Sequence, residues 1–110
     1  MTRDKRRPDI GRSYEGMIIY LATRVSGDPA YKDRCGAAAA RLTEKGAIVL
    51  HTTDIPLGLL YKDYMAISYA MMEASDAVCL MPDWAESAET RDKLSRAELY
   101  GLEVFEVEKI

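Results

Sequence analysis

The sequence is poor in the residues that build disulfide frameworks and zinc sites. It has two cysteines and one histidine in 110 residues. Cys35 and Cys79 lie far apart and in apolar contexts, so we expect buried thiols in a reducing compartment rather than a disulfide. One histidine with two cysteines gives no zinc-ligand spacing. No metal and no other cofactor is therefore expected.

An excess of positive charge and a long hydrophobic run are also missing. The net charge of -3 and the pI near 5.2 argue against a nucleic-acid-binding domain, which is usually basic. The apolar run 17–22 is far shorter than the roughly 20 residues that span a bilayer. We expect a cytoplasmic protein with neither a membrane nor a nucleic acid as partner. The basic residues 1–16 are interpreted as a flexible arm or as a segment that contacts an anion or a neighbouring subunit.

What the sequence does contain is a regular alternation of strand-like and helix-like segments. Strands are predicted at 17–22, 47–51, 77–81 and 102–107, and helices at 30–45, 61–75 and 87–100. This order predicts one α/β domain over residues 17–110, a four-stranded parallel sheet flanked by helices in the flavodoxin or Rossmann manner. Ligands of such sheets bind beyond the carboxyl ends of the strands. The segments expected to meet there are 23–28, 51–60 and 82–90.

The turn after the first predicted strand is one candidate binding segment. Gly27 permits a close backbone approach, Arg24 offers a fork of donors to an anion, and Ser26 adds a hydroxyl. The turn lacks the glycine spacing of a Walker or dinucleotide motif. An ordinary strand-to-helix turn is the alternative interpretation.

The start of the third predicted helix is a second candidate. Free backbone N–H groups and the helix dipole favour phosphate at such a position, and Ser87 and Thr90 add hydroxyls. Trp84 offers a flat face to a base or a sugar. Alternatively, Ser87 only caps the helix and Trp84 only packs.

Several ionisable side chains stand near the same predicted edge. Asp83 follows the third strand, where a carboxylate could act on a substrate. Glu89 and Lys93 lie four residues apart on one helix and form either a mild surface ion pair or part of a site. Tyr20 alternates into a buried strand, so its hydroxyl needs a partner.

Three segments together carry a resemblance to a known family. They are Ile19-Tyr-Leu-Ala22 followed by Ser26-Gly27, the Tyr64-Met65 helix ending in Ala74-Ser-Asp76-Ala, and Leu80-Met-Pro-Asp-Trp84-Ala-Glu-Ser87. Over about residues 17–107 the chain resembles the nucleoside 2-deoxyribosyltransferase-like superfamily, especially its short, mostly uncharacterised bacterial and phage members. The combination and order of the segments carry the resemblance, not any one of them.

The resemblance implies the same fold and a known chemistry. Enzymes of the superfamily cleave or transfer the N-glycosidic bond of 2′-deoxynucleosides or their 5′-monophosphates, with a glutamate as the nucleophile. Tyr20 matches their strand tyrosine, Ser87 the serine that grips a 5′-phosphate, and Gly27 the phosphate-side turn glycine. Because subunit contacts help form the site in these enzymes, the resemblance also implies a homodimer or a higher homo-oligomer.

The sequence departs from the superfamily at the catalytic positions. Lys93 stands where the glutamate is expected, and Ser68 stands where the second-helix aspartate is expected. A lysine with a pKa of about 10 is mostly protonated and cannot stabilise a developing sugar cation. Asp92 is the local substitute, but a regular helix points it about 100° away from Lys93. Lys93 with Arg24 would instead attract an anion.

Three hypotheses of function follow. The first is a nucleotide- or nucleoside-phosphate-binding protein that has lost the glycosidic reaction. The second is an active N-glycosidase or deoxyribosyltransferase in which Tyr20 is joined by Asp83, by Asp92 or by a carboxylate from another subunit. The third is a non-catalytic, homo-oligomeric interaction protein. The partner expected under the first two is a small-molecule nucleotide or nucleoside.

Overall fold

The computed structural model describes residues 14–110, and the prediction of a flexible arm falls mostly on residues 1–13, outside the described part. Its elements are β1 (Ile18–Ala22), α1 (Pro29–Glu44), β2 (Ile48–Leu50), α2 (Tyr61–Glu73), β3 (Ala77–Leu80), η1 (Trp84–Glu86), α3 (Ala88–Leu99), β4 (Glu103–Glu106) and η2 (Val107–Lys109). The strands form one parallel sheet in the order β2-β1-β3-β4. The predicted α/β fold with a four-stranded parallel sheet is confirmed.

The sheet order places a switch point between its two central strands. From β1 the chain crosses through α1 to β2 on one side, and then through α2 to β3 on the other side. The loops that leave β1 and β3 therefore diverge at the carboxyl edge of the sheet. In open α/β sheets, ligands bind in the crevice that such a divergence leaves.

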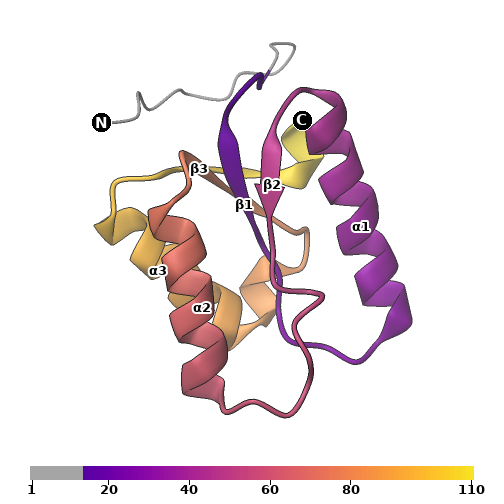
Figure 1. The fold of residues 1–110 in the computed structure, drawn as a ribbon, viewed down its shortest axis with the longest axis vertical. Helices are drawn as coiled ribbons and strands as arrows, with labels where there is room; N and C mark the ends of the chain where they lie inside the picture. Colours follow the sequence, from indigo (N-terminus) through magenta and orange to yellow (C-terminus); the bar gives the residue numbers. More distant parts are fainter. Residues whose placement is uncertain (1–13) are drawn as a thin grey trace.

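Helices cover both faces of the sheet. Figure 1 shows α1 on one face and α2 with α3 on the other. The alternation of β1 explains this arrangement, because Ile19 and Leu21 belong to the core beneath α1, whereas Tyr20 and Ala22 belong to the core beneath α2 and α3. A strand buried on both faces is typical of a parallel sheet.

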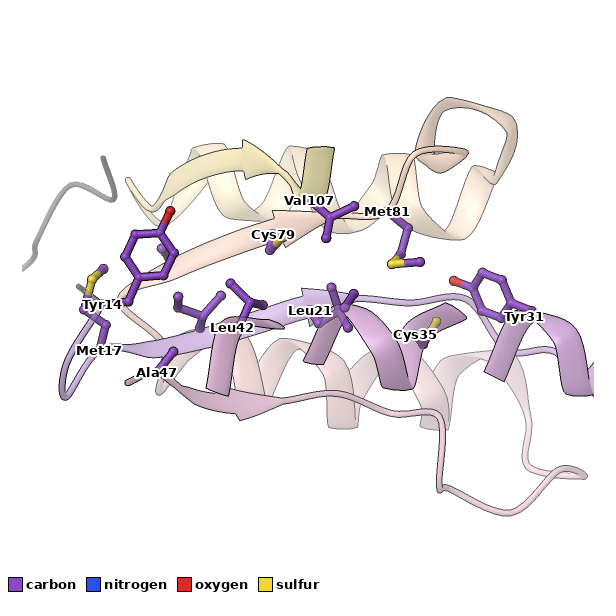
Figure 2. Packing of buried hydrophobic residues seen from close by; sticks show 13 residues of the cluster. Tyr14, Met17, Leu21, Tyr31, Cys35, Leu42, Ala47, Cys79, Met81 and Val107 are labelled. Carbon is purple, nitrogen blue, oxygen red and sulfur yellow. The ribbon is translucent and has the colours of Figure 1, made fainter. Parts of the chain in front are cut away.

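The core under α1 runs the full length of the sheet. In Figure 2, Leu42 and Cys35 of α1 lie against Leu21 and Cys79 of the central strands, with Tyr31 near the carboxyl edge. Both thiols are fully buried and free, as the sequence predicted.

The described residues before β1 pack on the domain. Tyr14 is buried, its ring centroid lies 5.9 Å from that of Phe105, and its backbone N–H donates to Lys45 O at 2.7 Å. A Cβ at Gly46, which has φ +95°, would lie 2.9 Å from Glu15 Cα. Glycine is therefore required where the chain leaves α1 beside this segment.

Helix α1 begins at Pro29, one residue before the predicted range 30–45. The Asp28 carboxylate accepts a hydrogen bond from Ala30 N at 3.0 Å, and Pro29 follows as the first helical residue. The turn before the helix is thereby fixed at its far end.

Among residues 14–110, no helix combines the length and the apolar character that crossing a membrane requires.

Candidate functional site

The turn after β1 and the start of α3 lie side by side at the carboxyl edge of the sheet. The Arg24 guanidinium forms an ion pair with Asp83, which follows β3. The Val25 N–H lies 3.3 Å from both carboxylate oxygens of Glu89 in the first turn of α3. The structure thus brings together two of the three predicted segments.

Arg24 is held in one orientation by its neighbours. Its guanidinium carbon lies 4.0 Å from the centroid of the Tyr31 ring, and the Tyr31 hydroxyl accepts a hydrogen bond from Arg24 N at 2.9 Å. The hydrogen bond to Asp83 raises the pKa of Arg24 above its ordinary value, so the group is a permanent cation. Its side chain remains 31% exposed, which leaves it accessible to a ligand.

Lys93 is an internal residue rather than an open cation. Its side chain is 0% exposed, and Nζ donates hydrogen bonds to Thr23 O and, at 3.2 Å, to Glu89 Oε2. Nζ also lies 5.6 Å from the centroid of the Tyr20 ring. The predicted Glu89–Lys93 ion pair is confirmed, but its place on the helix surface was wrong, because α3 turns this face onto the end of β1.

Two buried hydroxyl groups lie on the same side of the sheet. Tyr20 and Ser68 are both fully buried, and neither hydroxyl has a hydrogen-bond partner within residues 14–110. The sequence argument required a partner for the Tyr20 hydroxyl, and none of the described residues supplies it. Tyr20 and Ser68 come from β1 and α2, so this face of the sheet holds two buried hydroxyls without partners in the described part of the chain.

A small polar cavity opens between the β1–α1 turn and the β2–α2 loop. Its volume is about 120 Å³. Two cations, Arg24 and Lys32, lie on its wall together with Ser26, and one carboxylate, that of Asp54, lies opposite in the loop. The charged side chains on the wall are thus two cations and one carboxylate, and a second carboxylate, that of Asp83, pairs with Arg24 from outside the wall.

Internal hydrogen bonds hold the loop side of the cavity. Thr52 bonds to Thr23 through the two hydroxyl groups at 3.1 Å, next to the end of β1. The Tyr64 hydroxyl donates to Pro56 O at 2.8 Å and accepts from Leu59 N at 3.2 Å. This wall is formed before any ligand arrives.

Two backbone amides between β1 and α1 have no internal hydrogen-bond acceptor among the described residues. The amides of Arg24, Val25 and Asp28 donate to Tyr31, Glu89 and Ser26 Oγ, respectively. The amides of Ser26 and Gly27 donate to no other residue in the described part of the chain. Backbone N–H groups without an internal acceptor are available as donors to a ligand.

The hydroxyl residues predicted at the start of α3 have a structural role. The Ser87 hydroxyl accepts a hydrogen bond from Thr90 N at 3.2 Å and caps the helix. Neither Ser87 nor Thr90 is among the described residues that line the Arg24 cavity. The capping interpretation is confirmed, and a phosphate contact at Ser87 stays a prediction.

Trp84 and Asp92 lie away from the cavity. Trp84 in η1 donates from Nε1 to Glu106 Oε1 at 3.2 Å and borders an open groove of about 500 Å³ with Leu94 and Val104. Asp92 accepts a hydrogen bond from the Tyr61 hydroxyl at 2.9 Å on the exposed side of α3. Neither side chain joins Arg24 in the cavity.

Sequence reasoning missed part of the cavity wall. Lys32, Thr53, Asp54 and the supporting ring of Tyr31 were not named, although the segment containing residues 52–57 was expected at this edge. Lys32 had a usable signal, since it lies in the first turn of a helix whose start was predicted. Tyr31 gave none, because its contact with Arg24 depends on the path of the turn.

Comparison with known proteins gives a family but no activity. No three His, Cys, Asp or Glu side chains within residues 14–110 gather in a way that could hold a metal ion. No curated protein matches the chain. Residues 17–106 match the family described as a domain of unknown function, DUF4406, and this match spans every strand of the sheet. The chain therefore belongs to the DUF4406 family.

Proposed function

We propose that this chain binds the phosphate group of a nucleotide or nucleoside phosphate in the Arg24 cavity. One observation carries the proposal: Arg24, Ser26 and Lys32 line one polar cavity, and the amides of Ser26 and Gly27 beside it donate to no other described residue. Guanidinium groups and backbone amides are strong donors to phosphate oxygens. The position at the carboxyl edge of a parallel sheet fits the general rule for such folds.

The size of the cavity limits which part of the ligand enters it. At about 120 Å³, the cavity is small enough to take one group of a ligand rather than a whole ligand. That suits a phosphate group, and whole drug-sized ligands need roughly 300 Å³ or more. The remainder of the ligand lies over the rim.

The nucleotide assignment is supported by the resemblance to the nucleoside 2-deoxyribosyltransferase-like superfamily. Tyr20 and Gly27 match its positions, whereas Ser87, the match to its phosphate-gripping serine, lies outside the cavity. Gly27 borders the cavity, since a Cβ at this position would lie 3.4 Å from Leu57 Cδ1, a wall atom. Ser87 lies one residue before the helix that bears Glu89, the partner of Val25.

The charge partners favour binding over glycosidic cleavage. A retaining mechanism needs a carboxylate that faces the sugar. Asp83 is paired with Arg24, Glu89 with Lys93, and Asp92 accepts from Tyr61 on the exposed side of α3. We therefore propose a binding protein, whose association into a homo-oligomer stays a prediction.

Titration calorimetry with the four deoxynucleoside 5′-monophosphates tests this function. The wild type should bind at least one of them, and Arg24→Ala and Lys32→Ala should each raise its Kd about tenfold, as expected for one charge-assisted contact. Arg34→Ala is the matched control, because Arg34 lies 5.5 Å from the same Tyr31 ring but is not among the cavity residues.

Two outcomes would contradict the proposal. One is the absence of heat and of any thermal stabilisation with all four monophosphates at millimolar concentration. The other is an equal loss of affinity in the Arg34→Ala and Arg24→Ala variants. Chromatography of the same mixtures should show no free base beyond a protein-free sample, and base release that Asp92→Asn abolishes would favour the N-glycosidase instead.

A further inference from the structure

Four exposed apolar side chains within residues 57–61 lie beside the Arg24 cavity. Leu57, Leu59, Leu60 and Tyr61 are 62%, 43%, 63% and 52% exposed, and we call them the loop ridge. They run from the β2–α2 loop into the first residue of α2. Clusters of large exposed apolar side chains are uncommon on soluble domains and mark surfaces that bind something.

The loop ridge is continuous with the cavity. Leu57 belongs to the cavity wall, and Ile55 and Pro56 extend the apolar side of that wall. Leu57 also borders the turn with the free amides, because its Cδ1 would lie 3.4 Å from a Cβ at Gly27. The part of a ligand that extends out of the cavity on this side would contact apolar side chains.

The ridge is held in place although it is exposed. The Tyr64 hydroxyl bonds to the backbone of Pro56 and Leu59. At the other end, the Tyr61 hydroxyl donates to Asp92 of α3 at 2.9 Å. Because the backbone of this apolar surface is held at both ends, binding a flat group to it should lose little conformational entropy.

We propose that the loop ridge is the platform for the nitrogenous base of the bound nucleotide. This inference rests on the proposed function, because it assumes a phosphate in the cavity. The cavity of about 120 Å³ cannot enclose a base as well, so the base lies over the rim, where Leu57 supplies an apolar face. The protein therefore selects nucleoside monophosphates over inorganic phosphate and over sugar phosphates.

The test compares three ligands that share the phosphate group. Inorganic phosphate, 2-deoxyribose 5-phosphate and deoxyadenosine 5′-monophosphate are titrated into the full chain. The nucleotide should bind at least tenfold more tightly than the sugar phosphate. Leu57→Ser should reduce this ratio to below about threefold, because the nucleotide loses the apolar face and the sugar phosphate has no base to lose contact. Leu60→Ser should reduce the ratio less, because Leu60 is not a wall residue.

Leu99→Ser is the matched control, since Leu99 is 76% exposed at the end of α3 and lies outside the ridge. It should keep the tenfold ratio. Equal affinity for nucleotide and sugar phosphate in the wild type would overturn the inference and leave phosphate binding intact. A Leu57→Ser variant that changes oligomeric state in sedimentation but keeps the ratio would also overturn it, and would assign the ridge to a contact between copies. Absence of binding by all three ligands would refute the proposed function itself.

Discussion

At the level of single residues, the ion pair between Arg24 and Asp83 decides how strongly an anion can bind. The Asp83 carboxylate occupies the guanidinium that a phosphate would use. Tyr31 holds Arg24 independently, through its ring at 4.0 Å and its hydroxyl. Removing the charge of Asp83 should therefore make the Arg24 guanidinium available to an anion, while the contacts with Tyr31 keep it in place.

We expect Asp83→Asn to tighten deoxynucleotide binding about three- to tenfold, because a neutral amide competes less than a carboxylate for the cation. Calorimetry at fixed ionic strength measures the change in Kd. The double variant Asp83→Asn with Arg24→Ala is the control and should show no gain over Arg24→Ala alone. Weaker binding by Asp83→Asn would mean that Asp83 positions Arg24 rather than competing for it.

The buried pair of Lys93 and Glu89 governs stability at the same edge. Lys93→Met should lower the free energy of unfolding by about 3 kcal/mol, because it leaves the Glu89 carboxylate and Thr23 O without their buried cation. Urea denaturation measures the loss. Glu89→Gln in the Lys93→Met background should recover part of it, since a neutral amide costs less to bury than a carboxylate.

A double-mutant cycle of wild type, Lys93→Met, Glu89→Gln and the double variant tests whether the two side chains stabilise one another. Additive losses in the two single variants would show that Lys93 and Glu89 do not stabilise one another. A coupling of about 1 kcal/mol or more agrees with the geometry, in which Nζ and Oε2 lie 3.2 Å apart and Lys93 is fully buried.

Residue types alone predicted part of the site. Arg24 and Ser26 were found because their turn follows a strand in a parallel sheet, and both line the cavity. The environment of Lys93 could not be predicted, because a helix face that looks charged in sequence is turned onto β1 by the packing of α3. The partners of Trp84 and Asp92 depend in the same way on residues distant in the chain.

Among the elements, the start of α3 combines a structural cap with a predicted phosphate contact. Ser87→Ala should cost about 1 kcal/mol of unfolding free energy through loss of the hydrogen bond from Thr90 N. If the phosphate lies in the Arg24 cavity, nucleotide affinity should stay within about twofold of wild type. Calorimetry and urea denaturation of one preparation give both values.

Ser87→Asp separates the two roles of this position. An aspartate also caps a helix, so stability should return to near the wild-type value. Its negative charge would repel a phosphate bound at the helix start. A large loss of affinity in this variant, together with a loss in Ser87→Ala, would move the ligand from the cavity to α3.

Most element boundaries were predictable because local signals agreed with the fold. Pro29 after the Asp28 cap and Gly46 after α1 fix that helix, and the apolar run 77–81 gives β3. The short turn η1 was missed, since three residues are too few for a periodic pattern. The strand order was not fixed by any local signal, because it depends on how the crossovers pack.

For the whole molecule, burial of the two thiols makes stability depend on alkaline pH. Burial raises the pKa of Cys79 from 9.0 to about 12 and also raises that of Cys35. The unfolded chain therefore loses these protons at a lower pH than the folded chain. Stability is fully present below about pH 9 and falls as pH rises toward 12.

Between pH 8 and pH 10.5, Cys79 alone should remove about 2 kcal/mol from the free energy of unfolding, since one pKa unit is about 1.4 kcal/mol. Urea denaturation at both pH values measures this difference. Cys79→Ala should show a smaller decrease, although it is less stable throughout. A wild-type stability that does not change up to pH 10.5 would contradict the buried position of the thiol.

The outer strand β4 has a consequence for how copies of this chain can meet. It lies at the edge of the sheet and runs from Glu103 to Glu106 (Figure 1). Antiparallel pairing of two such edges would bring two glutamates from each copy into one short ribbon, where like charges repel. Near neutral pH the β4 edge therefore disfavours pairing of the sheets of two copies, and association would have to use another surface.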